Sequence, residues 1–195
     1  MVLLFSFRSS VADWYYVPTG SMEPTIQVGD RVVVDKSAYT LELPFTDVVV
    51  AKTGNINRGD IVIIDSNAAD TRLIKRVVAI EGDKVKLENN VLFINGEKAT
   101  LSVKGHNLYS EQILGQTRTI ALNPLPSPAK NFNLITVPRD HVLAMGDNRN
   151  NSVDSRYYGF IPIEEIQGKA NSVAFSLDPD DMYLPRKDRL FTSLY

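Results

Sequence analysis

The residues with the clearest chemical potential lie in the octet Pro-Thr-Gly-Ser-Met-Glu-Pro-Thr, residues 18–25. Prolines and a glycine packed this closely predict a loop, in which Ser21 directly follows Gly20. A serine after glycine on a tight turn can present its hydroxyl and its backbone N–H in the same direction. Acyl transfer needs this combination of a reachable nucleophile and an oxyanion donor. The competing interpretation is an ordinary turn with a capping serine.

A second candidate is the pair Lys75-Arg76 inside the run Leu73–Ile80. Alternate side chains of a strand point to opposite faces, so we expect one of the two cations to lie against an apolar face. Arginine keeps its proton, whereas desolvation can lower the pKa of a lysine by several units and make the lysine a base. The alternative interpretation is a strand edge whose long side chains reach water.

A third candidate is the polar segment from Gly146 to Gly159, which follows an apolar run. Its many donors and acceptors predict a loop held by internal hydrogen bonds and Asp–Arg pairs. The calcium-binding EF-hand template does not fit. Counted from Asp147, Ser152 stands at the glycine position and Tyr158 at the terminal glutamate position.

The amino-acid composition excludes several classes of site. The 195-residue chain has no cysteine, which excludes thiol nucleophiles, disulfides and Cys-ligated metals. Only two histidines are present, His106 and His141, so we expect no metal site. The formal net charge of −2, from 21 basic and 23 acidic residues, argues against a broad nucleic-acid-binding surface.

Short β-branched runs separated by Gly, Asp, Asn and Pro predict a mostly β fold. Three Gly-Asp pairs each precede a predicted strand, at 31–34, 61–64 and 84–87. Asparagine-rich turns at 89–90 and 95–96 predict hairpins. Residues 162–168 carry a weak helix signal, with proline at the start and glycine at the end. Further strands are expected near 47–51, 73–80, 91–94, 134–137, 141–145 and 172–175.

A shift in composition divides the chain. Residues 89–136 hold the hairpin turns and a proline-rich run, and they predict an inserted β lobe on a core formed by 11–88 and 137–195. Residues 1–10 form a short apolar segment, well below the ~20 residues that a membrane-spanning helix needs. We interpret this segment as the remnant of a membrane anchor, a surface-lying segment or a first strand.

With its three candidate segments in this order, the sequence resembles the type I signal peptidases. These are bacterial membrane-bound serine proteases that remove signal peptides from exported proteins. The resemblance covers nearly the whole chain, most loosely at 89–136, and implies twisted antiparallel sheets with an inserted β-rich lobe and very little helix. The residues that carry it lie at Tyr15–Thr25, Arg58–Val62, Ile74–Val78, Gly82-Asp83, Gly146–Gly159 and Gly168–Ala170.

By position, the resemblance implies that Ser21 is the nucleophile and Lys75 the general base. Ser152 would orient the Lys75 amine, and the Ser21 N–H with the Thr19 hydroxyl would form the oxyanion hole. The loop that carries Ser152 would be supported by Asp147, Asp154 and Arg156. Two shallow pockets for small substrate side chains would be lined by Tyr15, Val17, Pro18, Met22, Ile26 and Ile74, residues that also suit a plain hydrophobic core.

The resemblance also implies partners and a location. The substrates would be signal-peptide-bearing precursors, membrane lipid would be a partner, and no cofactor or nucleic acid would be needed. The protein would be located at the bacterial cytoplasmic membrane, with the catalytic domain on the outer (periplasmic or extracellular) face of that membrane. Family members carry spanning helices before the Arg8-Ser9 segment, where this sequence has about seven apolar residues.

Two other functions remain open at this point. One is a dedicated Ser–Lys maturation protease of a secretion or conjugation system, which would act on a single substrate. The other is a catalytically inactive β-rich module that binds secreted chains. Assays on several unrelated precursors distinguish the first alternative, and labelling of Ser21 by a serine-directed acylating probe distinguishes the second.

Overall fold

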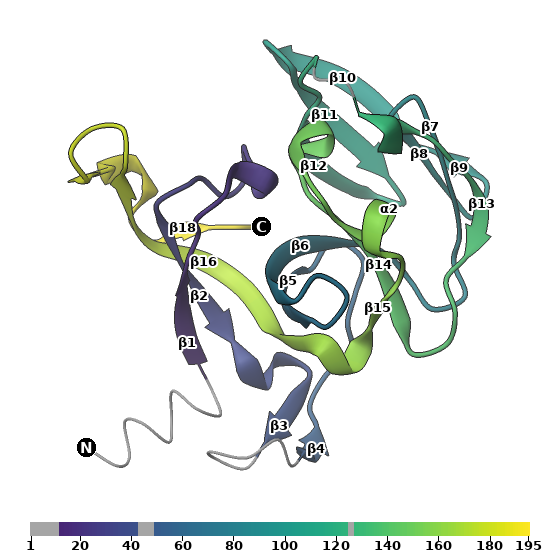
Figure 1. Ribbon diagram of the computed structural model, residues 1–195, viewed down its shortest axis with the longest axis horizontal. Helices are drawn as coiled ribbons and strands as arrows, with labels where there is room; N and C mark the ends of the chain where they lie inside the picture. The colour runs from purple at the N-terminus through teal and green to yellow at the C-terminus, as the bar shows by residue number, and fades with distance from the viewer. Residues whose placement is uncertain (1–11, 43–48, 125–126) are drawn as a thin grey trace.

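The structure is a computed structural model that describes residues 12–42, 49–124 and 127–195 (Figure 1). The apolar segment 1–10 lies outside the described residues, and the predicted strand at 47–51 is described only from residue 49. Strands dominate the described part of the chain, which confirms the mostly β prediction. Its one α-helix is α2 (Ser155–Tyr158). None of the helices in the described ranges has the length and apolarity needed to cross a membrane.

The largest sheet has nine strands and antiparallel pairing, in the order β1-β2-β16-β5-β6-β14-β15. The short strands β17 and β18 pair with β16, the longest strand. The members are β1 (Ala12–Tyr16), β2 (Asp30–Asp35), β5 (Ile61–Ser66), β6 (Thr71–Ile80), β14 (His141–Met145), β15 (Ile161–Pro162), β16 (Ile166–Asp178), β17 (Leu184–Pro185) and β18 (Thr192–Ser193).

The segment 84–136 forms two smaller sheets, and we call it the lobe; it lies at the upper right of Figure 1. One sheet has the order β13-β7-β8-β9 and the other β10-β11-β12. The lobe thus takes in β7, which precedes the predicted start of the insert at residue 89. Its strands are β7 (Lys84–Glu88), β8 (Val91–Ile94), β9 (Glu97–Lys98), β10 (Thr100–Gly105), β11 (Leu108–Ile113), β12 (Gln116–Ala121) and β13 (Phe132–Thr136).

The remaining elements are short. A separate two-stranded sheet joins β3 to β4. Six 3-10 turns connect strands in the described part of the chain. These elements are β3 (Thr40–Glu42), β4 (Val49–Lys52), η1 (Gly20–Met22), η2 (Lys36–Ala38), η3 (Pro128–Lys130), η4 (Arg149–Asn151), η5 (Ile163–Glu165) and η6 (Lys187–Arg189).

Turn chemistry explains why the predicted hairpins form. Asn89 and Asn90 both adopt positive φ, 49° and 65°, which asparagine tolerates better than most residues. The weak helix signal at 162–168 corresponds to the single 3-10 turn η5, and β16 begins at Ile166. Pairing of Ile166 with Ile64 of β5 extends this strand well beyond the predicted 172–175.

Buried apolar side chains join the lobe to the main sheet. Val78 of β6 and Met145 of β14 pack in one cluster with Leu87, Leu92 and Ile113 of the lobe. The lobe is therefore fixed against the two strands that carry and adjoin the candidate site. A second cluster underlies the turn η1 and contains Val17, Met22, Ile26, Val32, Val34, Ile61, Ile63, Ala170, Val173 and Leu194.

Candidate active site

Ser21 lies in η1, a turn whose position is fixed by buried side chains packed beneath it. Met22 at the end of the turn and Ile26 after it are almost completely buried in the second cluster, while Ser21 keeps partial exposure. The Glu23 N–H closes the turn on the Gly20 carbonyl at 3.1 Å. The hydroxyl of Ser21 is thus held in place but remains reachable from solvent.

Lys75 extends from β6 to this hydroxyl. Its Nζ lies 2.7 Å from Ser21 Oγ, and the residue is only 4% exposed. Burial lowers the pKa of Lys75 to about 8; the nearby carboxylates of Asp154 and Asp147 oppose this shift, and the charge of Arg156 adds to it. A lysine in this state loses its proton close to neutral pH and can act as a base.

Arg76, the neighbouring cation, is also buried, with 5% exposure. It donates two hydrogen bonds to Asp147, at 2.9 and 2.7 Å, and a third to the Gly59 carbonyl at 2.8 Å. The prediction that one cation faces an apolar surface was therefore too narrow, because β6 is covered on both faces. The two cations differ in their partners: a carboxylate keeps Arg76 charged, whereas Lys75 meets a neutral hydroxyl.

The loop 146–159 brings the remaining predicted polar residues to the same place. The buried hydroxyl of Ser152 donates to Asp154 Oδ2 at 2.7 Å, and Asp154 also accepts from the Gly146 N–H at 2.9 Å. Arg156 forms two 2.8 Å hydrogen bonds with the same carboxylate. No hydrogen bond joins Ser152 to Lys75 among the described residues.

This loop docks directly on the turn that carries Ser21. The Asn148 N–H donates to the Ser21 carbonyl at 3.1 Å, and Asn148 Nδ2 donates to the Gly20 carbonyl at 3.0 Å. Thr25 Oγ1 donates to Asp147 Oδ2 at 2.6 Å. Sequence reasoning did not single out Asn148 and Thr25, although both lie inside the candidate segments.

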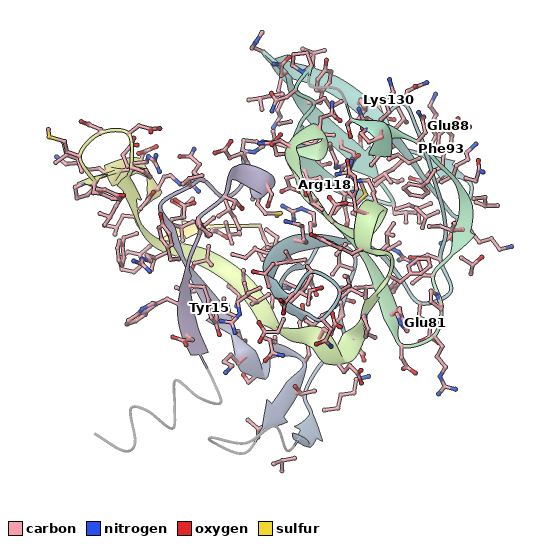
Figure 2. The ribbon with its side chains drawn as sticks, viewed as in Figure 1. Tyr15, Glu81, Glu88, Phe93, Arg118 and Lys130 are labelled. Carbon is pink, nitrogen blue, oxygen red and sulfur yellow. The ribbon has the colours of Figure 1, made fainter. Side chains whose placement is uncertain are left out.

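A cleft of about 340 Å³ leads to Ser21 and Lys75. Five of the six predicted substrate-binding residues line it, namely Tyr15, Val17, Pro18, Met22 and Ile74, and so does Thr19. Ile26 does not line the cleft, because it is fully buried beneath η1. The wall on β6 also includes Arg72, whose guanidinium lies 4.7 Å from the centre of the Tyr15 ring; Figure 2 shows Tyr15 on β1.

Thr19 precedes η1 as its N-cap residue, in an extended conformation. Its side chain makes no capping hydrogen bond and is exposed, so the hydroxyl is available beside Ser21. Within the described ranges, no group of three or more His, Asp or Glu side chains is arranged to hold a metal ion. The groups gathered at the head of the cleft are hydroxyls and one amine, which can perform acyl transfer.

Comparisons with known proteins identify a family that matches the chain. The family model described as "Signal peptidase, peptidase S26" matches residues 1–175. A crystal structure of a signal peptidase I from Enterococcus faecalis is 25% identical, with a TM-score of 0.40, and the match covers 59% of this chain and 96% of that one.

Two curated relatives are similar over most of the chain. Signal peptidase I of Pseudomonas aeruginosa is 33% identical over 215 residues, which cover 97% of this chain and 74% of that protein. Signal peptidase IB of Staphylococcus aureus is 33% identical over 170 residues, which cover 87% of this chain and 81% of that protein. On the family match and these identities, the chain belongs to the signal peptidase family, peptidase S26.

Proposed function

We propose that this protein cleaves N-terminal signal peptides from exported precursors through an acyl-enzyme on Ser21, with Lys75 as the general base. The observation that carries the proposal is the 2.7 Å contact between Lys75 Nζ and Ser21 Oγ, made by a lysine whose burial lowers its pKa to about 8. A neutral amine next to a hydroxyl is the minimal arrangement for activating a serine.

The reaction follows from these positions. Neutral Lys75 takes the Ser21 proton as Oγ attacks the scissile carbonyl carbon, and the resulting oxyanion accepts hydrogen bonds from the Ser21 N–H and the Thr19 hydroxyl. The carbon–nitrogen bond then breaks, and Lys75 returns the proton to the leaving amine of the mature chain. Lys75 next removes a proton from water, which attacks the ester, and the released Ser21 hydroxyl regains its proton.

Ser152 would orient the Lys75 amine in this scheme. Because the Ser152 hydroxyl already donates its proton to Asp154, its oxygen is left to accept a hydrogen bond. A lysine N–H is the matching donor, and its lone pair would then point to Ser21. Asp147, Asp154 and Arg156 would act through the loop that they hold, without touching the substrate.

The proposal includes the membrane as the location of the reaction. The partners would be precursor chains and lipid, at the outer face of the bacterial cytoplasmic membrane. Exposed apolar side chains on β1, on β16 and in the C-terminal segment support a lipid contact. They include Trp14, Tyr16, Phe175, Met182, Tyr183, Leu190 and Phe191.

Cleavage of several unrelated precursors tests the proposed function. Purified protein is expected to cut each precursor after a small residue, the preference that the resemblance implies for the cleft lined by Val17, Met22 and Ile74. Replacing that small residue with leucine is expected to slow cleavage about 100-fold or more, measured by gel assay and mass spectrometry of the products. Cutting of a single precursor would instead identify a dedicated maturation protease. Failure to cut any precursor or to react with an acylating probe would indicate an inactive module.

The pH dependence of the reaction provides a second test. Only neutral Lys75 accepts the serine proton, so kcat/KM is expected to rise with pH to a plateau above pH 8 and to fall about tenfold per pH unit below it. A rise in kcat/KM with its midpoint near pH 6 would indicate that a group other than Lys75 is the base.

The same shift has a consequence for stability. The pKa of Lys75 falls from its ordinary value of 10.5 to about 8 on folding, so the unfolded chain binds more protons between these values. The contribution of Lys75 to the free energy of unfolding therefore grows as the pH rises from 8 to 10.5.

A further inference from the structure

A buried carboxylate of the lobe lies between two arginines. Glu111 of β11 is fully buried, and its two oxygens accept hydrogen bonds from Arg149 Nη1 and Nη2 at 2.7 and 2.6 Å. Arg118 Nε of β12 donates to the same carboxylate at 2.6 Å. Figure 2 shows Arg118 where the lobe faces the rest of the molecule. Burial raises the pKa of Glu111, but the two guanidinium charges outweigh it and lower the pKa to about 2, so the cluster stays ionised.

The two arginines belong to different parts of the molecule. Arg118 is a lobe residue, whereas Arg149 begins η4, within the loop 146–159. Asn148, which precedes Arg149, donates hydrogen bonds to the carbonyls of Gly20 and Ser21. The Arg149 carbonyl accepts from Arg156 Nη2 at 2.6 Å. Glu111 is therefore connected to the turn of Ser21 by its hydrogen bonds to Arg149, by the peptide bond between Arg149 and Asn148, and by the hydrogen bonds of Asn148.

A second set of contacts joins the lobe to this loop. The Ala121 N–H donates to the Asp147 carbonyl at 2.9 Å. Asn123 Nδ2 donates to Asn148 Oδ1 at 2.9 Å, and the Asn123 carbonyl accepts from Asn150 Nδ2 at 2.6 Å. The loop is thus fixed on one side by the Ser21 turn and on the other by the lobe.

We propose that Glu111 is a positioning residue for acyl transfer, which makes the lobe a working part of the active site. The inference depends on Ser21 and Lys75 being the reacting pair. The bidentate pair of Glu111 with Arg149 fixes η4. This turn lies between Asn148, which donates hydrogen bonds to the nucleophile turn, and Ser152, which would orient the base. Without Glu111, the loop can shift by a fraction of an ångström at both ends, which is enough to misalign Ser21 with Lys75.

The test measures the first-order rate constant for acylation of Ser21 by a serine-directed acylating probe at saturation. This constant does not depend on the fraction of folded protein, which changes only the amplitude. Glu111→Gln and Arg149→Met are each expected to lower it about 10- to 100-fold. On a precursor, the same loss is expected in kcat with little change in KM.

Three further variants separate positioning from a purely structural role. Arg118→Met removes the lobe partner of Glu111 but keeps the Arg149 pair, and Glu165→Gln changes another buried carboxylate, on η5; both are expected to stay within threefold of the wild type. Asn123→Ala removes the bond to Asn148 without leaving a buried charge, and should lower the rate constant several-fold even if Glu111→Gln does not fold.

The outcomes distinguish failure of the positioning role of Glu111 from failure of the proposed function. Unchanged rate constants in Arg149→Met and Asn123→Ala would overturn the inference, as would an equal loss in Arg118→Met. If the wild type is acylated but cuts no precursor, the proposed function fails. The acylation rate constants of the variants still test the positioning role of Glu111. If the wild type is not acylated at all, the inference falls together with the Ser–Lys mechanism.

Discussion

Ser21→Ala and Lys75→Met are each expected to reduce cleavage by on the order of 10⁴- to 10⁶-fold, the range for removal of a nucleophile or its base. Ser21→Ala removes the atom that would form the ester in the proposed mechanism. Lys75→Met keeps the length and packing of a side chain that is 4% exposed, and removes only the amine. The loss should appear in kcat, measured with a precursor at saturation, with the melting temperature unchanged or raised because no buried amine remains to be desolvated.

Lys75→Arg is the matched control for this pair. It retains a positive charge near Ser21, but a guanidinium does not release its proton near neutral pH and cannot act as a base. The arginine variant is therefore expected to be as inactive as the methionine variant. Activity within tenfold of the wild type in Lys75→Arg would show that charge, and not proton transfer, is what position 75 supplies.

Gly146→Ala is expected to reduce kcat by about 100-fold or more, because a methyl group at this position has no space. The added Cβ would overlap the Ser152 hydroxyl and the Ser21 carbonyl oxygen, so one or both must move. A displacement of about 1 Å in a catalytic group is enough for this loss. Single-turnover acylation of Ser21 measures the effect independently of product release.

Gly105→Ala is the matched control for Gly146→Ala. Gly105 ends β10 in the lobe, and a Cβ there meets no atom within 4 Å. Both substitutions make the same chemical change, and neither glycine has positive φ, so backbone strain does not separate them. Gly105→Ala should retain wild-type kcat. Equal losses in both variants would contradict the steric role of Gly146.

The strands of the fold were largely predictable, because local signals define them. A Gly-Asp turn precedes β5, and β8 and β14 have the bounds 91–94 and 141–145 that the sequence predicts. The length of β16 was not predictable. Its 13 residues are fixed by pairing with β2 and β5, which come from distant parts of the chain. Local preference at 162–168 favoured one or two helical turns; the turn η5 forms, and strand pairing limits it from Ile166 onward.

The site was predictable to the extent that its residues lie in compact motifs. The serine turn, the Lys75-Arg76 pair and the polar loop could each be identified within their own segments, and the resemblance implied the roles of Ser21 and Lys75. Ile26 was assigned to the substrate pocket from its position in the motif, but its side chain packs under η1. Glu111 had no signal at all, because a lone acidic residue in a polar stretch resembles any solvent-exposed one. Only the fold brings Arg149 within hydrogen-bond distance of it.

The sequence by itself determined the β class, the turn that presents Ser21 and the chemistry available to the chain: hydroxyls and an amine, without thiols. These properties depend on residue types and on neighbours only a few positions apart. Only the tertiary structure shows which of the two adjacent cations meets Ser21 and which is paired with a carboxylate. Lys75 and Arg76 are adjacent in sequence, and strand alternation cannot tell which face each will meet. Folding places Asp147 against Arg76 and the neutral Ser21 hydroxyl against Lys75, and desolvation without a paired carboxylate is what lowers the pKa of Lys75.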